Sequence, residues 1–489
     1  MNRLMGGFEK FARGCQAVGG RFPKAVRVSA LVVFGLLGGV GFIPYWWSWV
    51  PFSLYLSAQF YVLQSASTRI RAGLQVWAMC ALAYFVSFHW IETPFEWTTF
   101  GWVAPVVHAV FVICFSGGTI GLASLFAYKR GLAAFSAAVV LGEWIKSWIF
   151  TGFPWSTVAH IWQNSVVLQA LALVGTFGLA FITAFLLTWS KEWRRARAGL
   201  AVFVLLFGAG RLYMYGDVGD SYLFVRGVSI DNSWDRNPDS KLDTYLKYSR
   251  IPIFRPIGLI VWPESGLRYD ISNDKEAAKT IIGALGANAL LTFDRRDVGE
   301  DGAILLRNSM GLLTTDGRLQ IYDKIRLVPF GEYVPPLIPG ISKFTEGTVD
   351  FSAGTEQTVM SVMGMRFVPL ICFEIIFPGL RLPQDVDFMV NTGNDMWISR
   401  QGKLQIAEMA RFRAIEEGMP VLRVSNTGVS GIISPLGEYR KRLFGDGVMD
   451  GFMPRRVLRP LFSWTGNLPV LVFVAIVLVF AGRKGRKGQ

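Results

Sequence analysis

Long apolar segments fill the first 216 residues of the chain. Seven stretches there approach the roughly 20 predominantly apolar residues that a membrane-spanning helix needs. They lie near 26–44, 47–65, 73–90, 102–127, 131–150, 166–189 and 198–214. An eighth and slightly short apolar stretch, 468–481, follows near the C-terminus. The pattern predicts a membrane domain of seven transmembrane helices in residues 1–216, and an eighth span with a basic tail in residues 464–489.

Lysine and arginine residues between these stretches predict the orientation of the helices, because short cytoplasmic loops retain such residues. Basic residues precede the first span and occupy alternate loops afterwards: Arg69 and Arg71, Lys129 and Arg130, and a cluster within 191–197. We therefore expect both termini in the cytoplasm and residues 217–463 outside. A cleaved signal peptide is the competing interpretation of the first 25 residues, but no clear small-x-small cleavage site follows their apolar run.

The segment 217–463 has a different texture, in which short β-rich runs alternate with charged stretches compatible with helices. The runs are 221–230, 257–263, 287–293, 303–314, 366–373, 386–392 and 419–426. The clearest helical stretches are 238–250, 272–286 and 401–418, and Gly418 is a typical helix stop. Largely apolar strands interleaved with helices predict an α/β domain whose sheets are buried on at least one face.

Composition and charge agree with a membrane protein. The chain of 489 residues is 52% hydrophobic and only 17% charged, against about 25% charged residues in an average soluble domain. Its net charge of +14 raises the possibility of nucleic-acid binding, but the basic residues lie in short clusters between apolar runs, which is typical of topology signals. We therefore expect a lipid bilayer and no nucleic acid as a partner.

Cysteine usage provides the first candidate for chemistry. None of the four cysteines has a C-x-x-C neighbour or a nearby histidine pair, so we expect no metal site. Cys372 is the only cysteine of the external segment, in "VPLICFEIIFP". A free cysteine is often just a small buried hydrophobe. Glu374 changes that balance, because residues i and i+2 of a strand face the same side and would place a carboxylate near the thiol.

Two further motifs carry ionisable side chains at the ends of apolar runs. Glu264 ends the run "IVWPESG", and Lys324 lies in "YDKIRLVPFGEYVP", whose prolines and glycine indicate a rigid loop. A turn carboxylate and a solvated lysine are the alternative interpretations. Together with Cys372 they make chemical sense, since a carboxylate can accept the thiol proton and a lysine can hold an oxyanion. All three histidines fall in the membrane part, which excludes a Cys-His dyad within the external domain.

These three motifs resemble the Glu-Lys-Cys triad of the carbon-nitrogen hydrolase (nitrilase) superfamily. The strings "LVPFGEYVP" and "GEWIKSWIFTGFPW", together with the arrangement of spans, are similar to the apolipoprotein N-acyltransferase family. The resemblance covers nearly the whole chain. It implies a nitrilase-like αββα sandwich over 217–463 in the periplasm, and a multi-pass protein of the bacterial inner membrane that needs no cofactor. We expect a monomer.

The family resemblance also implies roles for residues. Glu264 would be the general base, Lys324 the oxyanion-stabilising lysine and Cys372 the nucleophile. The supporting positions are Glu332 and Glu374 around the lysine, the backbone N–H of Phe373 as a second oxyanion donor, and the pocket residues Asn308, Asn394 and Trp397. Phe373 stands where the family often has tyrosine, and the run after Trp397 is shortened, which affects the acceptor side.

The implied reaction is the last step of bacterial lipoprotein maturation. By resemblance, Cys372 takes an acyl chain from the sn-1 position of a phospholipid as a thioester, and the N-terminal amine of an S-diacylglyceryl-cysteine then receives it in a ping-pong mechanism. A membrane-tethered nitrilase-type amidase is the alternative enzyme. A scaffold with a degenerate site is the non-enzymatic alternative, disfavoured because all three residue types of the triad are present.

Overall fold

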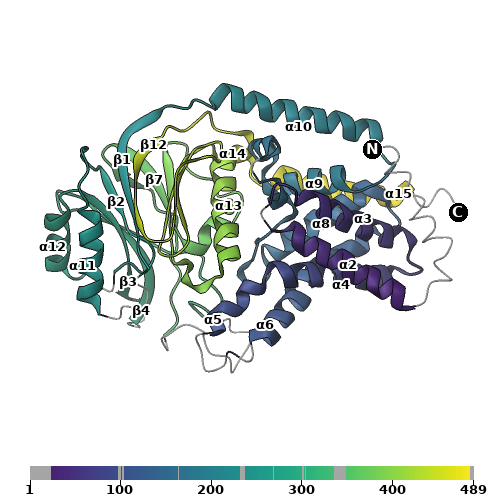
Figure 1. Ribbon diagram of the computed structural model, residues 1–489, viewed down its shortest axis with the longest axis horizontal. Helices are drawn as coiled ribbons and strands as arrows, with labels where there is room; N and C mark the ends of the chain where they lie inside the picture. Colours follow the sequence, from purple (N-terminus) through teal and green to yellow (C-terminus); the bar gives the residue numbers. More distant parts are fainter. Residues whose placement is uncertain are drawn as a thin grey trace.

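A computed structural model of the chain describes residues 24–43, 45–96, 101, 104–163, 165–231, 237–267, 269–299, 302, 304–334 and 349–484. The basic segment 1–23 and the end of the basic tail, 485–489, on which part of the orientation prediction rests, lie outside these residues. The described residues form a helical part and a part built on two β-sheets, which lie side by side (Figure 1).

Apolar helices form the first part and return at the C-terminus. They are α2 (Lys24–Gly41), α3 (Trp49–Ser65), α4 (Arg69–Ser87), η1 (His89–Glu92), α5 (Thr93–Glu96), α6 (Ala104–Val110), the π-helical η3 (Phe111–Gly117), α7 (Gly118–Ser124), η4 (Leu125–Ala127), α8 (Gly131–Lys146), η5 (Ile149–Thr151), η6 (Val158–Trp162), η7 (Val166–Ala170), α9 (Leu171–Leu187), α10 (Arg194–Tyr215), α14 (Leu461–Thr465) and α15 (Leu468–Lys484).

Every one of the eight predicted spans contains a helix, but the helices differ in length. Among the described residues, four are long and apolar enough to cross a membrane: Arg69–Ser87, Ala104–Ala127, Val166–Leu187 and Arg194–Tyr215. The apolar helices Arg27–Gly41 and Leu468–Ala481 are shorter, and α3 and α8 have 17 and 16 residues. A helical membrane domain agrees with these findings, while the count of eight spans stays a prediction.

Two six-stranded sheets form the second part. The strand order is β12-β1-β2-β3-β4-β5 in the first sheet and β11-β10-β9-β8-β7-β6 in the second. The strands are β1 (Asp220–Ser229), β2 (Leu259–Val261), β3 (Asn288–Val298), β4 (Ile304–Leu313), β5 (Leu319–Asp323), β6 (Met360–Val362), β7 (Met365–Ile371), β8 (Phe388–Gly393), β9 (Val421–Ser425), β10 (Val429–Ile433), β11 (Tyr439–Phe444) and β12 (Gly447–Pro454).

The two sheets pack face to face and helices cover both outer faces. Buried side chains from both sheets, among them Leu290 and Val390, share one hydrophobic cluster between them. Helices α11 (Pro238–Ser249) and α12 (Lys275–Leu285) cover the first sheet over a second cluster. Helix α13 (Arg400–Glu417) covers the second sheet and lies between it and the apolar helices (Figure 1). The result is a four-layer αββα arrangement.

Helix α13 joins the two parts of the molecule into one core. Its Ile406 and Phe412 belong to the same buried cluster as Phe177 of α9. Burying a side chain of this size contributes about 1.5–3 kcal/mol relative to leaving it exposed. Gly418 ends the helix with φ +65°, as its predicted role as a helix stop requires.

One strand ends earlier than its apolar pattern indicates. Strand β7 stops at Ile371, and Cys372–Ile376 forms the 3-10 helix η8. Cys372 therefore does not lie in a strand, and the expectation that Cys372 and Glu374 face the same side of one is wrong. The cause is the backbone of Cys372, whose φ of +49° no strand accommodates.

Candidate active site

The three candidate catalytic residues each follow the C-terminal end of a strand. Glu264 lies three residues after β2, Lys324 directly after β5, and Cys372 directly after β7. The first two strands belong to one sheet and the third to the other, so the candidate site is assembled from both sheets. This end of parallel strands is where α/β folds commonly bind ligands.

Glu264, Lys324, Glu332 and Asn308 form one buried polar cluster. The Lys324 Nζ lies 3.2 Å from Glu264 Oε1 and 2.9 Å from Glu332 Oε2. The Asn308 Nδ2 donates to Glu264 Oε1 and to Glu332 Oε1, both at 2.8 Å. Each of the four residues is less than 10% exposed. Because Asn308 and Lys324 each contact both carboxylates, the cluster holds Lys324 in a single place.

The two carboxylates keep Lys324 charged. Burial alone would lower the pKa of its ammonium group, but Glu264 and Glu332 outweigh burial and raise that pKa. Lys324 is therefore a permanent cation at neutral pH and cannot serve as a base. A fixed buried cation is the kind of group that stabilises an oxyanion.

Cys372 lies within the field of this cluster. Its side chain is partly exposed, and its positive φ is a conformation that non-glycine residues seldom adopt. Burial raises the pKa of the thiol well above its usual value, the negative charge of Glu264 raises it further, and Lys324 acts in the opposite direction. The resting sulfur is thus a neutral thiol with a carboxylate available as a proton acceptor. Strained backbone of this kind is concentrated at functional sites.

Glu374 supports the residues that follow Lys324 (the lysine loop, 325–332). Its Oε1 accepts hydrogen bonds from Tyr322 Oη at 2.8 Å, Ile325 N at 2.8 Å and Arg326 N at 3.1 Å, and its Oε2 accepts one from Ile371 N at 2.7 Å. Burial raises the pKa of the carboxyl, while these donors and Lys324 counteract the rise. Glu374 therefore ties the residues after Lys324 to the residue before Cys372.

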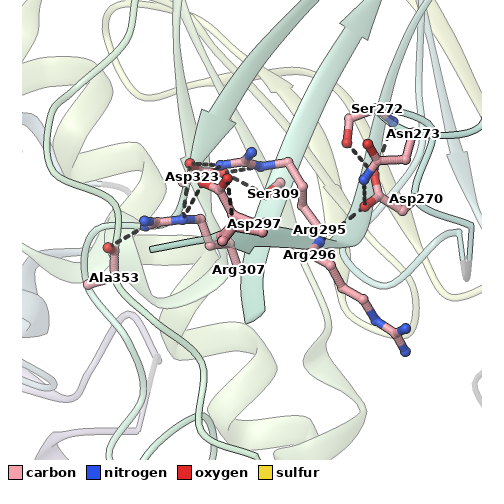
Figure 2. Close-up of polar contacts among 11 residues, drawn as sticks. Asp270, Ser272, Asn273, Arg295, Arg296, Asp297, Arg307, Ser309, Asp323 and Ala353 are labelled. Carbon is pink, nitrogen blue, oxygen red and sulfur yellow. Dashed lines mark hydrogen bonds and ion pairs between the residues drawn. The ribbon is translucent and has the colours of Figure 1, made fainter. Parts of the chain in front are cut away.

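A charged ladder holds β5, the strand directly before Lys324, at its last residue Asp323 (Figure 2). Asp323 precedes the lysine and faces away from it, as successive strand residues do. Arg295 of β3 forms a two-point contact with Asp323, at 3.2 and 2.7 Å, and Ser309 Oγ donates to the same carboxylate at 2.6 Å. Arg307 of β4 lies 3.8 Å from it. The ladder fixes β3, β4 and β5 relative to one another, and with them Asn308 and Lys324.

A second buried ion pair lies next to Asn394 in the sequence. The Asn394 N–H donates to Glu264 Oε2 at 2.9 Å, and its neighbour Asp395 pairs with Arg423 at 2.7 Å, both side chains being 1% exposed. Arg423 also donates to Asn391 Oδ1. Asn391 Nδ2 in turn donates to the carbonyl oxygen of Cys372 at 3.3 Å. This network connects the backbones on both sides of the candidate site.

The remaining predicted residues lie toward the apolar helices or at the edge of the site. Phe373 stacks on Phe153, with ring centroids 6.3 Å apart, and meets Phe377 edge-on at 5.3 Å. Trp397 ends the 3-10 helix η9 (Asp395–Trp397), is half-buried, and makes no hydrogen bond to Glu264, Lys324 or Cys372. The structure thus brings Glu264, Lys324, Glu332, Asn308 and the Asn394 backbone together, with Cys372 beside them.

Several residues of this region escaped the sequence analysis. Gln405 accepts hydrogen bonds from two buried indoles, Trp90 at 3.1 Å and Trp155 at 2.8 Å. No local pattern marks it, because a glutamine on a helix is ordinarily solvated. A signal did exist for Arg423, since a charged residue inside the apolar run "MPVLRVSN" needs a buried partner. Within the described part of the chain, no group of three or more His, Cys, Asp or Glu side chains could hold a metal ion.

Two protein-family models match separate parts of the chain. A family model of the carbon-nitrogen hydrolases matches residues 225–445, and one of the apolipoprotein N-acyltransferase N-terminal domain matches residues 34–189. The two-sheet part of the chain is thus similar to the carbon-nitrogen hydrolases. It is also similar, at 22% identity and a TM-score of 0.38, to the crystal structure of a CN-hydrolase superfamily protein from Xanthomonas campestris, covering 47% of this chain and 90% of that one.

Whole-length relatives share one name. The apolipoprotein N-acyltransferase of Rhodopseudomonas palustris is 28% identical over 93% of this chain and 94% of its own length. That of Rickettsia bellii is 29% identical over 82% of this chain and 84% of its own. That of Rhizobium leguminosarum bv. trifolii is 31% identical over 69% of this chain and 71% of its own. On these matches, the chain belongs to the apolipoprotein N-acyltransferase family.

Proposed function

We propose that the chain transfers an acyl chain from the sn-1 position of a phospholipid to the N-terminal amine of a lipoprotein's S-diacylglyceryl-cysteine. Family membership supports N-acylation of lipoproteins in general. The observation that carries the catalytic part is the buried cluster of Glu264, Lys324 and Glu332, whose charges act on Cys372. The cluster and Cys372 together supply a proton acceptor, a fixed cation and the one thiol in the sequence of the two-sheet part.

In the proposed first half-reaction, Cys372 Sγ attacks the ester carbonyl carbon while its proton passes to Glu264. The carbonyl oxygen gains negative charge, which Lys324 and the backbone N–H of Phe373 stabilise. The C–O bond to the glycerol then breaks, the leaving alkoxide takes the proton from Glu264, and a lysophospholipid departs. The acyl chain remains on Cys372 as a thioester.

In the second half-reaction, the α-amino group of the lipoprotein attacks the thioester carbonyl and Glu264 removes its proton. The C–S bond breaks and the thiolate takes that proton back, so the enzyme returns to its starting state. Division at a thioester suits a donor and an acceptor that need not be bound together. Glu332 and Glu374 position the lysine loop in this scheme, and Asn308, Asn394 and Trp397 shape the pocket.

The proposed topology places the two-sheet domain where lipid substrates can reach it. We assign residues 1–216 to a membrane domain, 217–463 to a periplasmic catalytic domain, and 464–489 to a last span and cytoplasmic tail, in a monomer of the bacterial inner membrane. Support comes from the alternate basic loops and from Phe373, whose ring packs against Phe153 of the helical part. Both substrates carry acyl chains, so a catalytic domain resting on apolar helices suits them.

Acyl-enzyme formation tests the proposal directly. Detergent-purified protein incubated with phospholipid should gain the mass of one acyl group on the peptide that contains Cys372, and hydroxylamine should remove it. Cys372→Ala should gain no such mass, whereas Asp316→Asn, at an exposed hairpin turn, should react like the wild type. Hydrolysis of small amides without any lipid dependence would favour the amidase, and an absent adduct in the wild type would contradict acyl transfer.

A further inference from the structure

A hollow lies between the two parts of the molecule, close to the candidate active site. Its walls come from Ser147 and Trp148 just after α8, from α9, from the residues after η8 and from Asn467 just before α15. Arg326, two residues after Lys324, supplies its one ionisable side chain. Trp148 on its rim is exposed, as aromatic residues at a membrane surface typically are.

Arg326 is a cation without an acid to pair with. Its guanidinium lies 4.1 Å from the ring centroid of Phe377, which orients the group but leaves its N–H donors free. Among the residues that the structure describes, none accepts a hydrogen bond from this guanidinium or forms an ion pair with it. Glu374 attracts it at a distance, but four other donors already occupy that carboxylate.

The backbone of Arg326 is nevertheless fixed. Its N–H donates to Glu374 Oε1 at 3.1 Å, and the same carboxylate holds Ile325 and Tyr322. An arginine that points from an anchored backbone into a hollow has a restricted reach, so little entropy is lost when its fork of donors meets a ligand. Planar donors of this kind match the oxygen atoms of a phosphate.

Another residue of the lining, Asn467, offers an acceptor. Asn467 precedes α15, and its Nδ2 donates to the carbonyl oxygen of Pro378 at 3.2 Å. Its Oδ1 is buried and has no hydrogen-bond partner in the described part of the chain. An unsatisfied buried acceptor is costly, and a ligand carrying an amine or hydroxyl next to an anion would satisfy it. A donor and an acceptor facing one hollow indicate a ligand with both kinds of group.

The location of the hollow indicates where its ligand comes from. Trp148 follows the end of α8 and Asn467 precedes the start of α15, so the hollow lies where two apolar helices meet the two-sheet domain. Under the proposed topology this is the level of lipid head groups. Phe377 connects the hollow to the site, because it contacts both Arg326 and Phe373, the neighbour of Cys372.

We propose that this hollow binds the phosphate of the donor phospholipid, with Arg326 as its anion-binding residue and Asn467 accepting a hydrogen bond from the rest of the head group. The inference rests on the proposed function and extends it from the acyl chain to the head group. Free phosphate has the same chemistry at Arg326, so the test separates the two sources.

The test compares two acyl donors in mixed micelles: a phospholipid, and a diacylglycerol with the same chains but no phosphate. We expect Arg326→Gln to lower kcat/KM for thioester formation from the phospholipid about tenfold, chiefly through KM, which is the discrimination expected of one charged contact. With the diacylglycerol as donor, Arg326→Gln should form the thioester at a rate within about twofold of the wild type. Arg326→Lys should retain part of the preference for the phospholipid, and Arg318→Gln, an exposed arginine at the β4–β5 turn, should change neither rate.

Other outcomes would contradict the proposed head-group site. Equal losses with both donors would mean that Arg326 only supports the fold, and unchanged rates with the phospholipid would mean that it binds no head group. Inhibition of the wild type, but not of Arg326→Gln, by millimolar inorganic phosphate would assign the hollow to free phosphate. A wild type that forms no thioester from either donor contradicts the proposed function instead. In that case, phospholipid retention by Cys372→Ala with and without Arg326→Gln, measured by native mass spectrometry, still decides the head-group site.

Discussion

At the scale of single residues, the charges around Cys372 determine the protonation of its sulfur. Burial and the carboxylate of Glu264 both raise the pKa of the thiol, and Lys324 lowers it. An enzyme that waits with a neutral thiol avoids the oxidation and stray alkylation to which thiolates are prone. Under the proposed mechanism, the thiolate forms only when a substrate brings an electrophile within reach and Glu264 accepts the proton.

This arrangement predicts opposite effects of two substitutions on thiol reactivity. Glu264→Gln removes a negative charge, so the pKa of the thiol falls and alkylation of Cys372 by iodoacetamide rises at a lower pH than in the wild type, even though acyl transfer is lost. Lys324→Met removes a positive charge and moves the alkylation profile to higher pH. Peptide-level mass spectrometry over a pH series measures both. Shifts in the same direction would refute the electrostatic account.

At the scale of elements, cross-strand polar contacts hold β3, β4 and β5 next to the candidate site. Asp323 lies directly before Lys324, and Arg295 and Ser309 hold its carboxylate from the two neighbouring strands. The polar residues of this ladder continue β3 to Val298, although the apolar pattern indicates an end near 293. Cross-strand ion pairs replace hydrophobic burial there, and no pattern based on apolar residues can find them.

Asp323→Asn should therefore weaken the β4–β5 hairpin, which directly precedes Lys324. The substitution leaves Asp297 as the one countercharge that Arg295 and Arg307 share among the described residues. We expect the free energy of unfolding to fall by about 1–3 kcal/mol, with slower thioester formation. Arg318→Gln is the matched control, since it lies at the exposed turn of the same hairpin. Thermal unfolding in detergent measures both, and equal melting temperatures for the two variants would show that the ladder contributes nothing.

A glycine in the loop after α8 is a second sensitive element. Gly152 has φ +88°, and an added Cβ would lie 2.0 Å from the carbonyl oxygen of Ser147 and 3.1 Å from the ring of Phe377. Gly152→Ala should displace the loop that packs against Phe377 and lower both stability and activity. Gly283 in α12 has open space around it, so Gly283→Ala should raise the free energy of unfolding by up to about 1 kcal/mol. Equal effects of the two substitutions on the melting temperature would contradict this account.

The sequence predicts the elements better than the contacts between them. Apolar runs locate the eight helical stretches and seven strands, and the motifs around Glu264, Lys324 and Cys372 indicate the site region before any geometry is known. The turn at Cys372 could not be predicted, because "VPLICFEIIFP" continues an apolar run through a residue with positive φ. Strands β5, β6, β10, β11 and β12 escaped because their short or charged sequences pair only in the context of the folded sheet.

At the scale of the whole molecule, α13 is the mechanical link between the two parts. It covers the second sheet and packs on α9. Near its C-terminal end, Arg413 pairs with Glu416 at 2.8 Å, and Glu416 accepts hydrogen bonds from the backbone and hydroxyl of Thr176 in α9. Near its N-terminal end, Gln405 binds the two indoles of the helical part. Polar contacts at both ends therefore set how the two-sheet part packs on the apolar helices.

Gln405 allows this link to be tested without changing the candidate catalytic residues. Gln405→Ala leaves two buried indole N–H groups, those of Trp90 and Trp155, without an acceptor, at a cost of about 1–3 kcal/mol each. We expect faster hydrogen exchange in 88–92 and 152–158, and a loss of activity with long-chain phospholipids, while the hydrogen exchange of the strands in the two sheets stays unchanged.

Two control variants accompany this test. Gln405→Glu keeps an acceptor and should retain much of the activity. Gln401→Ala, one turn earlier, removes a single long contact to the Ser87 carbonyl at 3.4 Å and should have little effect. If Gln405→Ala and Gln401→Ala behave alike, the contact between the two parts is carried by apolar packing alone, and the polar link at this end of α13 has no role in acyl transfer.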